Sequence, residues 1–225
     1  MFSWFFLGVA VGSLVPDADV SGSLIFHRKV RGVEGGFGRF VNDFVAPLFP
    51  VFGYVTRYLI YLPAVMLFDR VSSYSFGDWH RSFSHSLLGL FTMSSVTGLY
   101  IWVLSSYLGF YSFQLLFLFL SGYLLGGFLH LFEDSCTRTG IAWNSPFSDF
   151  KLCGDLKTSG KPVYVRGPRR LFYAFVVVAA VSFIGSSLEL YGVSARGYSF
   201  AAFLVDIGIW TVFAYLVDLR LETPG

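Results

Sequence analysis

The sequence predicts an all-α protein: a polytopic transmembrane helical bundle with about five crossings and one re-entrant or interfacial segment. Hydrophobic residues make up 55% of the 225-residue chain and charged residues only 13%, about half the charged share of a soluble domain. The mean hydropathy is +0.64, and apolar runs of about 20 residues recur along the chain. Residues 1–225 are therefore predicted to form a single integral-membrane domain, with membrane lipids as its main partners.

The apolar runs differ in how well each suits a crossing. The N-terminal run 2–15 is short and ends at Pro16, and it is predicted to cross in a thinned or tilted setting. The run 44–68 holds three prolines and a central Arg57, which favour a re-entrant or interfacial segment. Complete crossings are predicted at 85–107, 111–131, 171–190 and 198–219.

The positive charges predict the orientation. This topology places 14 of the 16 Lys and Arg residues in loops on one face, which the positive-inside rule makes cytoplasmic. The predicted location is thus the inner or plasma membrane, with a cytoplasmic C-terminus and a cytoplasmic polar loop at 135–170. Cys136 and Cys153 lie in that loop, where two free thiols are favoured over a disulfide. A net charge of +2 predicts no nucleic-acid partner.

Three polar motifs lie at the ends of apolar runs. Pro16 is followed by Asp17 and Asp19, two carboxylates that can bracket one ion. His80 and His85 lead into the run 85–107. The third motif ends the partner run, where the spacing of four places both side chains on one helix face, and it consists of His130 and Asp134.

Together the motifs hold three imidazoles and three carboxylates, and the predicted topology places all of them on the cytoplasmic face. Mixed nitrogen and oxygen ligands suit a divalent metal, zinc first, with manganese or iron as alternatives. Six ligands suit two ions better than one. Each motif alone also has a plain structural interpretation, as an interfacial polar pair, an Asx-turn or a lipid-headgroup contact. Ionisable side chains are costly to place in or near a membrane and tend to be functional there, which favours the interpretation as a metal site.

The same motifs resemble the YdjM-like family of membrane-bound metal-dependent hydrolases, which are inner-membrane proteins. The family pattern is roughly Pro-Asp-x-Asp, then His-Arg-Gly-x-Thr-His-Ser, then Gly-Tyr…His-x-x-x-Asp…Gly, and it matches residues 8–150 here. The resemblance implies a functional set of six residues: Asp17, Asp19, His80, His85, His130 and Asp134. Val20 stands where the family often has histidine, and His27 is a candidate substitute ligand.

The expected function is metal-dependent hydrolysis at the cytoplasmic membrane surface. Glu133 is the candidate general base, and Arg81 lies between two histidines, where it can bind an anionic group. The basic residues of 135–170 would attract anionic headgroups, so a phosphoester or phospholipid is the expected substrate. The alternative is a metal-binding or transport membrane protein without catalysis.

Overall fold

The structure, a computed structural model, describes residues 2–30, 35–71, 83–156 and 196–222. The predicted crossing 171–190 lies outside these residues. The described chain is mostly helical, which confirms the predicted all-α class. It forms two compact units, the first being Met1–Asp134, Ile141–Lys151 and Thr223–Gly225, and the second Ser135–Gly140 and Leu152–Glu222. The single-domain organisation stays a prediction.

The first unit contains the predicted helix hairpin. The helices α5 (Leu87–Tyr107) and α6 (Phe113–Ser135) coincide with the runs predicted to cross, and both are long and apolar enough to do so. Ser86 begins α5, since its hydroxyl accepts a hydrogen bond from the amide of Gly89 at 3.0 Å. Gly109 takes a φ of 76° in the tight turn that follows α5.

The helix α1 (Phe2–Leu14) has 13 residues, so it is about 20 Å long. That is less than the hydrocarbon thickness of about 30 Å. The structure therefore confirms the helix predicted at 2–15, while its crossing stays a prediction.

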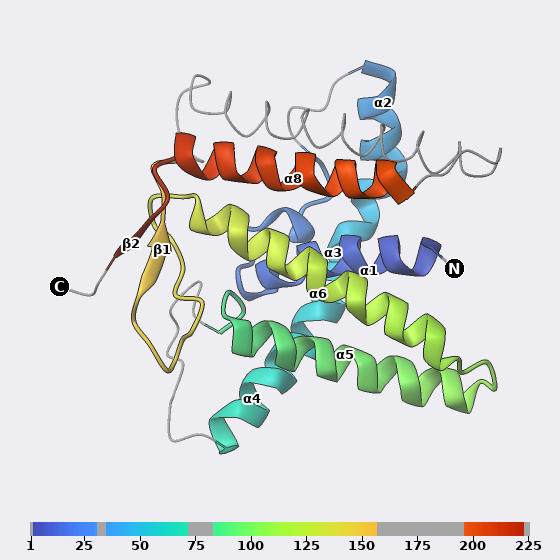
Figure 1. The fold of residues 1–225 in the computed structure, drawn as a ribbon. Helices are drawn as coiled ribbons and strands as arrows, with labels where there is room; N and C mark the ends of the chain where they lie inside the picture. Colours follow the sequence, from blue (N-terminus) through green and yellow to red (C-terminus); the bar gives the residue numbers. More distant parts are fainter. Residues whose placement is uncertain (1, 31–34, 72–82, 157–195, 223–225) are drawn as a thin grey trace. The chain divides into compact units, whose positions relative to one another are not determined.

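The proline-containing run forms one long helical segment, drawn from top to bottom in Figure 1. Gly38–Arg70 is 33 residues long and, by length and composition, apolar enough to span a membrane. Pro47 and Pro50 occupy the first turns of their helical pieces, where a missing amide N–H costs little. The segment changes helical type repeatedly, from α2 (Gly35–Phe40) through η3 (Val41–Val45), η4 (Ala46–Leu48), α3 (Phe49–Val55) and η5 (Thr56–Tyr61) to α4 (Leu62–Val71).

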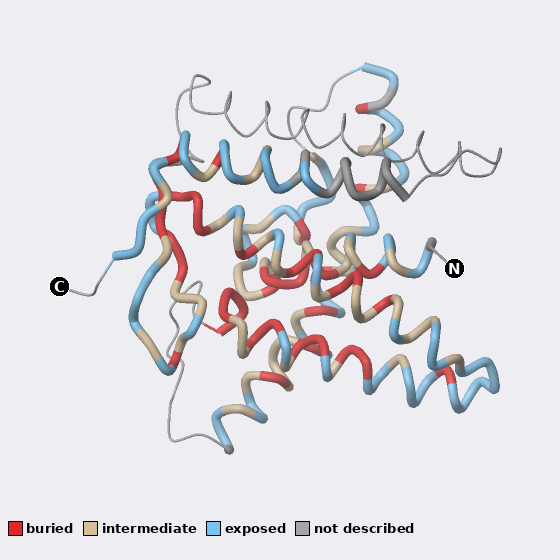
Figure 2. Tube along the Cα trace, in the orientation of Figure 1, coloured by how far each residue is buried: buried red, intermediate tan, exposed pale blue. Residues whose placement is uncertain are grey.

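The core of the first unit lies where this long segment meets α1, α5 and α6, and Figure 2 shows buried residues gathered there. Its members come from the long segment, from α5 and α6, from the loop before α5 and from the residue directly after α1: Val15, Ile60, Ala64, Phe83, Leu90, Met93, Phe119 and Tyr123. Val15 and Phe83 place this core next to the Pro-Asp-Ala-Asp motif and to His85.

The second unit contains α8 (Arg196–Leu216), which coincides with the predicted crossing 198–219. The strand β1 (Lys151–Cys153) pairs with β2 (Arg220–Glu222), so part of the loop predicted at 135–170 is ordered by the C-terminal strand. Cys136 and Cys153 are buried and no disulfide joins them. Because the two strands pair, we expect Lys151–Cys153 and Arg220–Glu222 on one side of the membrane.

Candidate metal centre

The first contributor is the Pro-Asp-Ala-Asp motif, which forms the 3₁₀ turn η1 (Pro16–Asp19) directly after α1. Pro16 and Ala18 are buried and anchor the turn in the core. The side chain of Asp19 is 6% exposed and that of Asp17 is 34% exposed. The turn therefore presents one enclosed carboxylate and one that solvent can reach.

His85, in the loop before α5, is 1% exposed and lies between two carboxylates. Its Nε2 is 3.0 Å from Oδ2 of Asp134, and its Nδ1 is 3.8 Å from Oδ2 of Asp19. The hydroxyl of Ser84 is 2.9 Å from Nδ1. The simplest tautomer has Nε2–H donating to Asp134 and Nδ1 accepting from Ser84, an assignment made from these partners.

His130 and Asp134 lie on one face of α6, as their spacing predicts. Nε2 of His130 is 3.6 Å from Oδ2 of Asp134 and 3.8 Å from Oδ1 of Asp17. The rings of His85 and His130 are 5.4 Å apart. Asp134 thus lies between two imidazoles, and each imidazole also faces one carboxylate of η1.

Glycines in α1 and α6, which belong to none of the predicted motifs, hold the first and third motifs together. A Cβ on Gly8 would clash with the carbonyl of Phe119, and one on Gly122 would clash with the carbonyl of Phe5. The next pair repeats this arrangement, because Gly12 faces the carbonyl of Tyr123 and Gly126 that of Val9. The sequence signal that could have found them is the spacing of four between glycines within each helix, Gly8 and Gly12 in α1 and Gly122 and Gly126 in α6. This spacing is typical of closely packed membrane helices.

This close packing sets the register of the centre. Gly12 lies four residues before Pro16, and Gly126 lies four residues before His130. The backbone contact between α1 and α6 therefore occurs about one helical turn from the residues that must meet. It brings Asp17 to His130 although 113 positions of sequence separate them.

The geometry fits a divalent cation. Asp17, His85 and His130 each offer a ligand atom, and these atoms all lie within 4.8 Å of one another. Two ligands of one tetrahedral zinc are about 3.3 Å apart, so separations of 3.6 and 3.8 Å around His130 suit an ion better than a direct hydrogen bond.

Two further observations support this fit. Nε2 of His130 is buried and makes no hydrogen bond among the described residues, which is a costly state for a polar atom. Burial raises the pKa of the Asp17 carboxyl, and the imidazoles of His130 and His85 oppose that rise. A bound cation would accept the lone pair of the His130 imidazole and would favour the ionised form of the Asp17 carboxylate, so it would relieve both of these unfavourable states.

The remaining predicted site residues are placed as follows. Glu133 is exposed on α6, near enough for its charge to act on His130. His27 is exposed, its Nε2 is 3.2 Å from the carbonyl oxygen of Gly22, and it is not in the group of three potential ligands. Two predicted residues lie outside the described part of the chain: His80 and Arg81.

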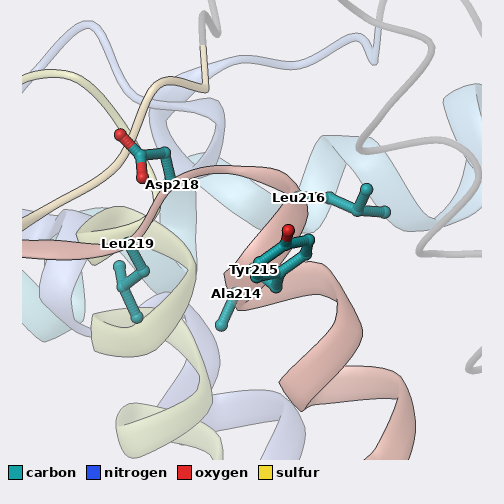
Figure 3. A pocket seen from close by; sticks show the side chains of 5 residues that line it. All are labelled: Ala214, Tyr215, Leu216, Asp218 and Leu219. Atoms are coloured by element: carbon teal, nitrogen blue, oxygen red, sulfur yellow. The ribbon is translucent and has the colours of Figure 1, made fainter.

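The second unit has a hollow at the end of α8, shown in Figure 3. Its volume is about 530 Å³, and Ala214, Tyr215, Leu216, Asp218 and Leu219 line it. Asp218 is the single carboxylate among these lining residues. One carboxylate offers no cation site comparable to the group around His130.

The fold and the site define an α-helical membrane protein with a partly buried group of histidines and carboxylates at the end of a helix hairpin. The chain belongs to the YdjM inner membrane protein family, because the model of that family matches residues 2–217. This match confirms the resemblance found in the motifs and the membrane location. No curated protein and no solved structure matches the chain.

Proposed function

We propose that this protein is a metal-dependent hydrolase of the inner membrane, with its site on the cytoplasmic face. The observation that carries the proposal is the meeting of Asp17, His85 and His130 around Asp134, from three segments far apart in sequence. Zinc is the proposed cation, and manganese or iron would suit the same ligands. The six predicted ligands also allow two ions.

The proposed chemistry divides between the metal and the protein. A divalent cation in this set would lower the pKa of a water molecule toward 7 and polarise the bond to be cleaved. Asp134 would hold His85 in its ligating orientation through the 3.0 Å contact. Asp17 lies on the exposed side, where substrate would enter, and Glu133, also exposed, would accept a proton as the general base.

The proposed substrate is a phosphoester or phospholipid. Arg81 precedes His85 by four residues, and a guanidinium binds phosphate through paired hydrogen bonds. The chain also concentrates its basic residues near the predicted cytoplasmic face, where anionic headgroups are attracted. The same charges also orient the protein in the membrane, so the substrate class is tested separately below.

A second candidate is a membrane protein that binds or transports metal without catalysis. It is favoured by the enclosure of His85 and Asp19, whose side chains are 1% and 6% exposed. Closed sites are typical of structural metals, whereas catalytic sites keep an open coordination position. The 34% exposure of Asp17 favours the catalytic proposal.

The deciding experiment measures bound metal in the detergent-purified protein and then activity. We expect His130→Ala and Asp17→Asn to lose most of the metal, with His27→Ala as a matched control that keeps it, since His27 lies outside the group. Unchanged metal in both site variants would contradict the site.

A panel of soluble phosphoesters and phospholipid vesicles then tests catalysis on the metal-loaded protein. Metal-dependent turnover that His130→Ala abolishes supports the hydrolase. Metal uptake into proteoliposomes without turnover on any member of the panel supports the second candidate.

A further inference from the structure

We propose that the long helical segment Gly38–Arg70 does not cross the membrane, but lies in the plane of one leaflet, the one that contains the candidate metal centre. There it packs against the acyl chains of that leaflet. The inference goes beyond the proposed function. It requires that the centre be assembled as the structure shows, and does not require metal binding or catalysis.

Asp17 and His85 contribute to one group, so the chain between them must cross the membrane an even number of times. In the described part of this stretch, Gly38–Arg70 is the one segment long and apolar enough to cross. Residues 71–84 number 14, too few for a crossing helix of about 17–25 residues. Residues 20–37 include four charged or histidine side chains within five positions, 27–31, which excludes a second crossing there. The even number is therefore zero.

The long segment runs in a different direction from the α5–α6 hairpin (Figure 1). Figure 1 shows the line through α3 and α4 running crosswise to α5 and α6 within the first unit. Helices that cross a bilayer together tilt by about 20° on average from its normal. A segment crosswise to the α5–α6 hairpin therefore lies near the membrane plane when the hairpin spans it.

The long segment contacts α5 near the beginning of that helix. Ile60 and Ala64 pack in the cluster that contains Leu90 and Met93 of α5. These two residues follow the N-cap Ser86 by four and seven positions, which is about 6 and 10 Å along the helix axis. Interfacial helices lie about 5–10 Å into the boundary between headgroups and acyl chains, the depth at which this contact occurs.

The side of the segment that faces away from the protein is apolar, which suits contact with acyl chains. The protein-facing side of the segment is buried at Gly53, Thr56 and Ile60. The opposite side exposes large apolar side chains at mostly three- or four-residue spacing, all at least 46% exposed: Phe44, Leu48, Val51, Val55, Leu59 and Met66. Such a stripe suits hydrocarbon rather than water. A charged arginine at the centre of the bilayer would cost about 3 kcal/mol. In the in-plane orientation Arg57 stays away from the centre, and its guanidinium lies over the ring of Phe26 at 5.9 Å.

Depth measurements on spin labels in nanodiscs test the proposal. A single spin-labelled cysteine replaces Phe44, Val55 or Met66 in a protein that carries Cys136→Ala and Cys153→Ala. The accessibility of each label to oxygen, relative to its accessibility to a water-soluble nickel complex, reports how deep the label lies in the bilayer. We expect the three labels to lie within about 5 Å of one depth, one helical turn. A crossing helix would place Val55 about 16 Å deeper than either end. A difference beyond about 10 Å would overturn the proposal.

The matched control is α5, whose exposed residues Phe91, Leu99 and Tyr107 lie at equal spacing. Their labels should report a gradient, with Leu99 about 12 Å deeper than the ends. A second measurement keeps the native cysteines, which are buried. A membrane-impermeant maleimide should label Lys29→Cys and Asp69→Cys from the same side of sealed vesicles, whereas labelling from opposite sides would overturn the proposal. Neither measurement depends on metal or activity.

Discussion

At the scale of single residues, Asp134 is central to the candidate centre. Its Oδ2 is 3.0 Å from Nε2 of His85 and 3.6 Å from Nε2 of His130. One oxygen therefore contacts His85 directly and also lies close to His130, and the two imidazoles come from different helix ends. A carboxylate in this position acts either as a ligand or as the partner that fixes the ring of a ligating histidine.

This position predicts the effect of Asp134→Asn. The amide keeps the shape of the side chain but removes the charge, so metal affinity should fall about 10- to 100-fold while the helix content is unchanged. Asp69→Asn, at the exposed end of α4, is the control. Competition with a fluorescent chelator measures the affinity, and equal affinity in both variants would remove Asp134 from the centre.

A second residue tests the energetics of burial. The Thr56 side chain is 1% exposed, and its hydroxyl makes no hydrogen bond among the described residues. Thr56→Val keeps the branched shape and removes the unsatisfied group, so we expect stability to rise by about 1 kcal/mol. Thermal unfolding in detergent should show a midpoint about 2–4 °C higher. A lower midpoint would mean that the hydroxyl has a partner.

The residues of the site were largely predictable, because the helical spacing of His130 and Asp134 gives their shared face directly. The approach of Asp17 and Asp19 was predictable only through the parity of crossings. The sequence could not predict which nitrogen of His85 faces Asp134 and which faces Asp19. That depends on the orientation of the ring, which the contact with Ser84 and the surrounding packing determine. The contact of His27 with the carbonyl oxygen of Gly22, and its absence from the group of three potential ligands, were likewise not predictable.

At the scale of elements, the contact between α1 and α6 converts sequence spacing into site geometry. Gly12 and Gly126 leave room for the backbones to touch. This allows a helix too short to span alone to carry Asp17 to His130. The irregular pieces of Gly38–Arg70 were less predictable, since three prolines indicate interruption but do not specify which helical type replaces it.

This contact predicts that Gly12→Ala separates the helices. The added methyl would clash with the backbone carbonyl of Tyr123, and the backbone cannot move aside as a side-chain tip can. Overpacking of this kind costs about 1–3 kcal/mol, and moving Asp17 should lower metal affinity at least about tenfold. Gly208→Ala is the matched control in α8, where a Cβ meets nothing within 4 Å.

Unfolding midpoints and metal titrations on both variants check the prediction. Gly208→Ala should match the parent protein in both measurements, or gain slightly in stability because alanine favours the helix. A Gly12→Ala protein with the parent's metal affinity would show that η1 finds His130 without the helix contact.

At the scale of the whole molecule, the pairing of β1 with β2 joins residues 151–153 to residues 220–222. Two strands of one sheet lie on the same side of a membrane, so we expect an even number of crossings between them. Composition predicted the membrane class, because so little charge is present. It could not predict this pairing, since two three-residue strands carry almost no periodic signal.

The pairing predicts that the loop and the C-terminus react from one side of the membrane. Ser148→Cys lies in the loop before β1, and Leu221→Cys lies in β2, where the native side chain is 66% exposed. In sealed vesicles of one orientation, an impermeant maleimide should label both variants or neither, whereas the buried native cysteines should stay unlabelled. Inverting the vesicles should reverse both results together. Labelling of Ser148→Cys and Leu221→Cys from opposite sides would require an odd number of crossings between the strands, which is incompatible with a sheet that contains both.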